Sequence, residues 1–251
     1  MLRLCLLLLW LALPATAENV VLGLSQDRVA ITTSFDGSEI LIFGAVKREV
    51  PIPDTSQLEV IVTVAGPSQA VLVRRKAKRY GIWVNTDAVE VDAAPAFYAV
   101  ATSGPLREVL SDVEDLRHRI SIPRAIRSVG APQNILDSRN FTRALIRIRE
   151  DSGQYQLLEN KVAVDEQTLF RTRIQLPAAL VEGEYATRIF LAREGQIVSD
   201  FETTITVDKV GLERWLFDMS RQQPLLYGIM SLAIAIAAGW TASAAFSLLR
   251  N

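Results

Sequence analysis

Arginine side chains recur at four-residue spacing in the middle of the chain, at Arg139, Arg143 and Arg147. On a helix this spacing places them along one face, because side chains four residues apart are neighbours. The planar guanidinium group binds oxyanions such as carboxylate, sulfate or phosphate through paired hydrogen bonds. The wider segment Arg117–Arg149 holds eight arginines and a single acidic residue. We interpret the row as a site for an anion or an anionic partner; the alternative is a solvated face balanced by acidic strands elsewhere.

A second basic feature is the run Arg74–Arg79, in which five of six residues are Arg or Lys. Side chains on a strand alternate between its two faces, so these cations cannot all lie on one side. One interpretation is the end of a strand that frays into a solvated loop. The other is a contact with anionic lipid headgroups or with an anionic ligand.

The sequence contains few residues that could perform catalysis. It has one His and one Cys, which excludes a multi-histidine metal centre and a cysteine-based zinc site. A Ser-His-Asp triad could use only His118, and no Gly-x-Ser-x-Gly motif presents a serine, so we interpret His118 as a surface residue. Glu114 and Asp115 are adjacent and point to different sides of a helix. We therefore predict a protein that is not an enzyme and that binds no metal or cofactor.

The charge balance also excludes a class of partner. The chain has 27 basic and 28 acidic residues, for a net charge of −1. Such a balance produces no overall field to attract DNA or RNA, so we expect no nucleic-acid partner.

Residues 1–17 have the pattern of a secretory signal peptide. Arg3 precedes an apolar run, and Ala15-Thr16-Ala17 has the small-x-small pattern of a cleavage site. The alternative, a short N-terminal membrane anchor, is disfavoured because the run is too short to span a bilayer.

The other end of the chain predicts a transmembrane helix at 224–249. Leu225–Leu249 contains no charged residue, and Pro224 stands at its start, where a missing N–H costs nothing. At 1.5 Å per residue the helix is about 37 Å long, enough to cross a hydrocarbon core of about 30 Å. A buried core helix and a cleaved lipid-anchor signal are the disfavoured alternatives.

The signal peptide and the span together predict the orientation. The residues between them would be exported, and 250–251 would form a cytoplasmic stub. Lys209, Arg214 and Arg221 flank the exported side, whereas Arg250 alone lies on the other side. The positive-inside rule favours the opposite orientation, but the signal peptide commits the chain before the last helix emerges.

The predicted span carries small residues at four-residue spacing: Ser231, Ala235, Gly239 and Ser243. A ridge of small side chains lets another helix approach closely, so the row is a candidate packing surface. About half of the span is small, and such a row also arises by chance.

Between the two ends, short apolar strands alternate with turn signals such as Asp36-Gly37. Tyr185 follows a Gly turn, as in the tyrosine corner of immunoglobulin-like sandwiches; the alternative is an ordinary strand tyrosine. The predicted fold is mainly β: an immunoglobulin-like sandwich with a helical insert and one C-terminal transmembrane helix. The predicted segments are a β-rich region at 18–102, a helical insert at 103–152, an immunoglobulin-like region at 153–208 and a juxtamembrane amphipathic helix at 209–223.

Three blocks of sequence resemble one known family. They are Gly23–Ala45 with its Phe35-Asp36-Gly37-Ser38-Glu39-Ile40 turn, Val73–Asn85, and Phe97–Val100. Together with the C-terminal span they resemble an alphaproteobacterial family of transmembrane proteins, over essentially the whole mature chain. The resemblance implies an inner-membrane protein facing the periplasm, with genes often found beside sulfite-exporter-like permeases. It carries over no catalytic or binding residue.

These observations favour an accessory or scaffold subunit of an inner-membrane partner, such as a sulfite-exporter-like permease. The alternative is a free-standing periplasmic module that binds a ligand or senses the state of the envelope.

Overall fold

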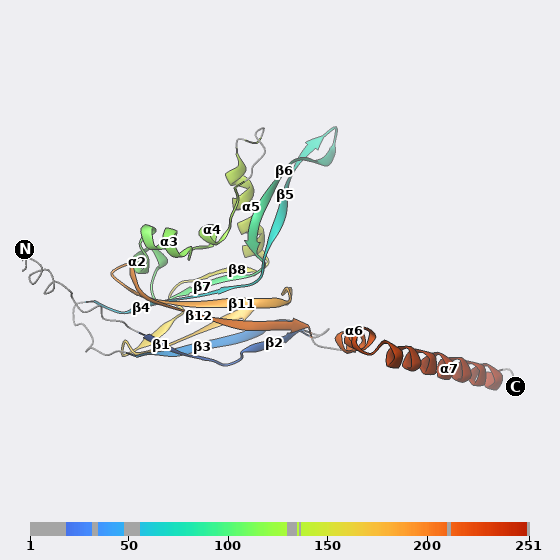
Figure 1. Cartoon of the computed structure of the whole chain (residues 1–251). Coiled ribbons are helices and arrows are strands. Elements are labelled where there is room, and N and C mark those ends of the chain that lie inside the picture. The colour runs from blue at the N-terminus through green and yellow to red at the C-terminus, as the bar shows by residue number, and fades with distance from the viewer. Residues whose placement is uncertain are drawn as a thin grey trace, which may run out of the picture. The chain divides into compact units, whose positions relative to one another are not determined.

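The computed structural model describes residues 19–31, 35–47, 56–129, 135, 137–209 and 212–249 (Figure 1). The predicted signal peptide at 1–17 and the predicted stub at 250–251 lie outside these residues. The chain forms two compact units: Met1–Val29 with Phe35–Val207, and Ala30–Ser34 with Asp208–Asn251. Each unit is described by itself.

The first unit contains a four-stranded and a six-stranded sheet. The four-stranded sheet has the order β1 (Asn19–Leu24), β3 (Ser38–Lys47), β10 (Leu169–Leu176), β9 (Ala163–Asp165). The six-stranded sheet has the order β2 (Arg28–Ile31), β12 (Gln196–Lys209), β11 (Gly183–Arg193), β4 (Glu59–Ala65), β7 (Tyr98–Thr102), β8 (Tyr155–Leu158).

Strands from the two ends of the chain share both sheets. β3 pairs antiparallel with β10 in the register Ile42↔Thr172, and β4 pairs antiparallel with β11 in the register Val62↔Ile189. β7 and β8 form a parallel pair, with α-helices in the connection between them. The two predicted β regions are therefore parts of the same sheets.

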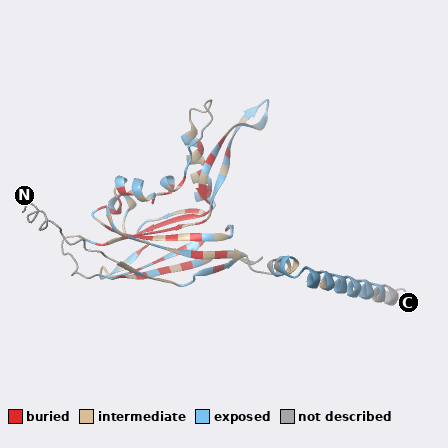
Figure 2. Cartoon of the chain, viewed as in Figure 1, coloured by how far each residue is buried: buried red, intermediate tan, exposed pale blue. Residues whose placement is uncertain are grey.

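The burial pattern distinguishes the two sheets (Figure 2). All five residues of β7 are buried, as are Val60–Val64 of β4, which is typical of strands covered on both faces. β10 instead alternates between exposed and buried residues, so one face of the four-stranded sheet packs inward and the other faces solvent. The six-stranded sheet is thus the central layer.

Helices and a hairpin cover the second face of the six-stranded sheet. Tyr98, Val100 and Phe190 of the sheet belong to one buried cluster with residues of these elements. The helices are α2 (Leu106–Val109), α3 (Asp112–His118), α4 (Ile122–Ala125) and α5 (Ser138–Asp151).

The predicted helical insert at 103–152 begins with two short helices, α2 and α3, which are separated by a break. The break falls at Leu110, whose backbone is extended, and Ser111 caps α3 through the Glu114 amide. The break lets the adjacent Val109 and Leu110 both enter the core and leaves Val113 exposed. The Ser103 hydroxyl, ahead of α2, accepts a hydrogen bond from the amide of Val60 at 2.9 Å.

β5 (Ser68–Arg79) and β6 (Ile82–Pro95) form a long antiparallel hairpin with a sheet of its own. Its turn is Tyr80-Gly81, with φ values of +49° and +87°. Positive φ at both central residues is what a two-residue hairpin turn of type I′ requires. The basic run forms the last six residues of β5 and stays paired with β6 up to Arg79↔Ile82, so it is a strand end but does not fray into a loop.

Tyr185 makes the contact of a tyrosine corner. Its hydroxyl donates to the carbonyl of Val181, four residues upstream, at 2.8 Å. Burial raises the pKa of Tyr185, although the Val181 bond acts in the opposite direction. The prediction of a mainly β fold with a C-terminal apolar helix is confirmed.

The second unit contains α6 (Leu212–Gln222) and α7 (Pro224–Leu249). Within the described residues, Pro224–Ser243 is the one segment long and apolar enough to cross a membrane.

Candidate functional sites

The predicted arginine row lies on α5. Arg139, Arg143 and Arg147 are exposed, while Phe141 and Leu145 on the opposite side are buried. None of the three arginines makes an ion pair or hydrogen bond within the described part of the chain. The row is therefore accessible to an external anion, and its role stays a prediction.

Arg149, one turn beyond Leu145, is the residue whose role sequence reasoning missed. The apolar Ile148 is exposed, whereas the charged Arg149 beside it is buried. Its Nη1 donates to the carbonyl of Ala96 at 2.7 Å, and its guanidinium lies 5.5 Å from the centre of the Tyr155 ring. The four- and eight-residue spacing of Arg149 from Leu145 and Phe141 was the available signal.

Tyr155 completes this contact. Its hydroxyl donates to the carbonyl of Pro95 at 2.9 Å, and burial raises the pKa of Tyr155 to about 12. Because Pro95 is the last residue of β6, Arg149 and Tyr155 hold the root of the hairpin.

Arg75 connects the hairpin to the start of α5. Its guanidinium lies 4.5 Å from the Phe141 ring centre and forms ion pairs with Asp87 at 3.6 Å and with Asp137. Hydrogen bonds from Asn140 and Arg75 hold the pKa of Asp137 below its ordinary value. Arg75 is therefore engaged inside the unit and is not available to a ligand.

The other cations of the basic run face outward. Arg74, Lys76 and Lys78 are exposed and alternate with partly or fully shielded neighbours along β5. Near them the tip presents Ile82 and Trp83, whose residues are 65% and 68% exposed. The hairpin thus combines exposed basic and apolar side chains at one end.

The outer face of the four-stranded sheet carries an apolar patch, defined by Val21, Phe43 and Leu169. These residues are 59%, 43% and 54% exposed and come from three neighbouring strands. A Cβ on Gly23 would lie 2.5 Å from the Phe43 ring, so glycine there lets the ring lie against β1. Charged residues such as Arg171 and Asp165 border this patch, which makes it a candidate binding surface.

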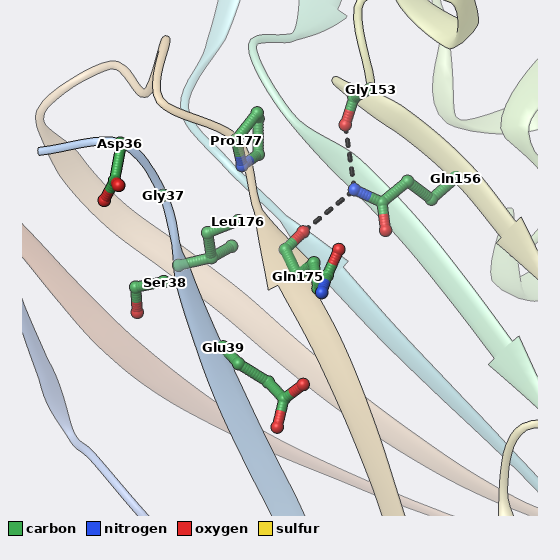
Figure 3. A pocket seen from close by; sticks show the side chains of 9 residues that line it. All are labelled: Asp36, Gly37, Ser38, Glu39, Gly153, Gln156, Gln175, Leu176 and Pro177. Atoms are coloured by element: carbon green, nitrogen blue, oxygen red, sulfur yellow. Dashed lines mark hydrogen bonds between the residues drawn. The ribbon is translucent and has the colours of Figure 1, made fainter.

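A polar pocket of about 480 Å³ lies between the turn before β3, the end of β10 and the start of β8 (Figure 3). Gln156 donates from Nε2 to the carbonyls of Gly153 and Gln175, at 2.8 and 2.9 Å. The bond to Gln175 ties β8 of one sheet to β10 of the other. Glu39, also in the wall, pairs with Arg173 at 3.5 Å, and this exposed pair joins β3 and β10 within the four-stranded sheet.

His118 is only partly exposed, unlike the predicted surface residue. Its Nε2 lies 3.3 Å from a carboxylate oxygen of the buried Glu114, and its ring meets the Phe190 ring edge-on. No hydroxyl or thiol of a described residue hydrogen-bonds to His118 as a catalytic nucleophile would. Among the described residues, no group of three His, Cys, Asp or Glu side chains could hold a metal.

The small-residue row lies on α7, where Ser231, Ala235, Gly239 and Ser243 are all exposed. A Cβ on Gly239 would meet no atom within 4 Å. Nearly every described side chain of α7 is exposed, so exposure does not distinguish this row from the other faces.

The fold and these sites define a mainly β body joined in sequence to a helix that can span a membrane. The sequence model of the family described as "Putative transmembrane protein (Alph_Pro_TM)" matches residues 19–247. The chain belongs to this family, which confirms the resemblance of the three sequence blocks. A comparison with curated proteins gave no match. The protein is therefore a membrane protein with one candidate C-terminal span among the described residues.

Proposed function

We propose that the chain is a non-enzymatic accessory or scaffold subunit of an inner-membrane partner, such as a sulfite-exporter-like permease. Its β body would lie in the periplasm, and its C-terminus in the cytoplasm. The observation that carries the proposal is the apolar patch of Val21, Phe43 and Leu169 on the outer sheet face. Such a patch, rimmed by polar residues, is typical of a surface that another protein covers.

Two further surfaces would extend the contact with the partner. The arginine row of α5 is suited to carboxylates on a periplasmic loop. The small-residue row of α7 would let a partner helix approach closely within the bilayer.

The test is purification of the tagged full-length protein from native membranes in mild detergent. We expect one multi-spanning protein to co-purify in constant ratio. Val21→Ser with Leu169→Ser should remove it, whereas the control Val113→Ser with Leu116→Ser, on the exposed side of α3, should retain it. Circular dichroism of each variant verifies that the sheets remain folded.

Recovery of the protein alone, or equal loss with both pairs of variants, would overturn the proposal. Arg143→Glu with Arg147→Glu tests the contribution of the arginine row. Gly239→Leu with Ser243→Leu tests the small-residue row of α7. Recovery of the protein alone would favour the other candidate function, a free-standing periplasmic module that binds a ligand or senses the envelope.

A further inference from the structure

The tip of the β5–β6 hairpin presents residue types that membrane interfaces select. Tyr80 is fully exposed, and Ile82 and Trp83 are about two-thirds exposed. Tyr and Trp are enriched at the headgroup level of bilayers, because each combines an apolar ring with a polar group. None of these side chains contributes to the core of the first unit.

The backbone conformation at the tip supports the same interpretation. Tyr80 occupies a turn position with φ of +49°, where Asn, Asp or Gly is usual and an aromatic residue is disfavoured. The Tyr80 side chain is fully exposed, so it makes no packing contact that could offset the energetic cost of this conformation. An unfavourable residue at an exposed turn is a sign of function at the tip.

The charge beside the aromatic residues is positive. Lys78 lies directly opposite Trp83 in the hairpin register, so both project from the same face, and Lys76 follows two residues away. Arg79 adjoins the turn. Lys76, Lys78 and Arg79 form no ion pair or hydrogen bond within the described residues, so their charges are available to an anionic surface.

The hairpin also has the reach and the anchorage for such a contact. Beyond the last buried pair, Val73 and Val89, it extends by six residues on β5 and seven on β6, or about 20 Å. Its root is held by Arg149 and Tyr155.

We propose that the hairpin tip docks on the anionic headgroup layer of the bilayer that anchors the chain. Tyr80 and Trp83 would lie at the interface, and Lys76, Lys78 and Arg79 would bind lipid phosphates. The α7 span keeps the body at the bilayer, which raises the effective concentration of headgroups around the tip. Each basic residue near an anionic surface strengthens such binding about fivefold.

The experiment follows Trp83 fluorescence in the full-length protein held in nanodiscs, each of which offers a single bilayer. Trp10→Phe, Trp215→Phe and Trp240→Phe leave Trp83 as the one tryptophan. Nanodiscs of phosphatidylcholine are compared with nanodiscs that also contain phosphatidylglycerol, with and without brominated acyl chains. We expect a blue-shifted emission and bromine quenching in the anionic nanodiscs only.

The charge variant Lys76→Gln with Lys78→Gln should lower the bound fraction relative to the free fraction about 25-fold, at about fivefold per charge. The matched control Arg171→Gln with Arg173→Gln removes two exposed cations from the outer face of the four-stranded sheet and should leave quenching unchanged. Circular dichroism verifies the fold of both variants.

Three outcomes would overturn the proposal. Unquenched Trp83 in both lipids would show that the tip does not reach the bilayer. Equal quenching in both lipids would exclude recognition of anionic headgroups. A photoreactive amino acid at position 83 that labels a protein rather than lipid in native membranes would assign the tip to a protein partner.

Discussion

The root and the tip of the β5–β6 hairpin belong to the same two strands and have opposite environments. At the root Val73, Val89 and Val91 are buried, whereas at the tip Ile82 and Trp83 are exposed (Figure 2). Burial explains the apolar residues of the root, because removing them from water stabilises the fold. It does not explain the apolar residues of the tip. The comparison therefore separates residues that serve stability from residues available for binding.

The largest expected effect is at the root. Phe141→Ala removes the ring that packs between the helices, the hairpin and the Arg75 guanidinium, and should lower the free energy of unfolding by about 3–5 kcal/mol. Phe141→Leu, which keeps most of the volume, should lower it by less. Urea denaturation of the full chain in detergent, followed by circular dichroism of the sheets, measures both. Equal, small losses would show that the root is not part of the core.

Arg149→Met tests the buried guanidinium that holds the β6–β7 connection. The substitution leaves the carbonyl of Ala96 without its hydrogen-bond donor, so we expect the free energy of unfolding to fall by about 1–3 kcal/mol. Arg147→Met, on the exposed face of the same helix, is the matched control and should change little. If both variants lost the same stability in the same denaturation experiment, the assigned role of Arg149 would be wrong.

Tyr155→Phe removes the hydrogen bond to the Pro95 carbonyl and should lower the free energy of unfolding by about 1 kcal/mol. The pH dependence provides a second test. An unfolded tyrosine ionises near pH 10, whereas Tyr155 in the fold stays protonated to about pH 12. The unfolded state therefore binds fewer protons in this window, and stability falls as the pH rises through it.

Replacement of Tyr155 should reduce the decrease of the free energy of unfolding with rising pH only in part. Burial also raises the pKa of Tyr98 and Tyr185, so these two residues contribute to the same decrease. Denaturation curves at several alkaline pH values, for the wild type and Tyr155→Phe, measure the difference. An unchanged slope would show that Tyr155 is not the group responsible.

The smallest effect on stability is expected at the tip. Trp83→Ser should change the free energy of unfolding by no more than about 0.5 kcal/mol, because the side chain is exposed. Tyr80→Asn should raise stability slightly, since Asn adopts positive φ more readily. Both variants should nevertheless weaken lipid binding. A large loss of stability from either would remove the contrast between root and tip.

Several features of the fold and of the sites were predictable from local sequence pattern. The helical insert predicted at 103–152 contains α5, Ser138–Asp151, whose residues recur at helical spacing. The exposed arginine row followed from the same periodicity. The identity of Arg149 as a buried residue did not follow, because a charged residue in an apolar stripe is buried only if a distant partner, here Ala96, accepts its hydrogen bond.

The hairpin shows where local pattern is insufficient. The apolar runs predicted only short strands between turn signals, whereas the hairpin strands are long, Ser68–Arg79 and Ile82–Pro95. Cross-strand pairing stabilises the polar residues between these runs in an extended conformation. Propensity along one strand contains no information about that pairing.

The sequence by itself determined the mainly β class, the C-terminal apolar helix and membership of the family, because alternation, uninterrupted apolarity and ordered sequence blocks are properties of the chain alone. Only the tertiary structure decided that β3 pairs with β10 and β4 with β11, so that the two ends of the body share both sheets. It also decided which cations of the basic run are engaged and which are free. The physical reason is that strand pairing, burial and ion pairs depend on residues far apart in sequence, which folding alone brings together.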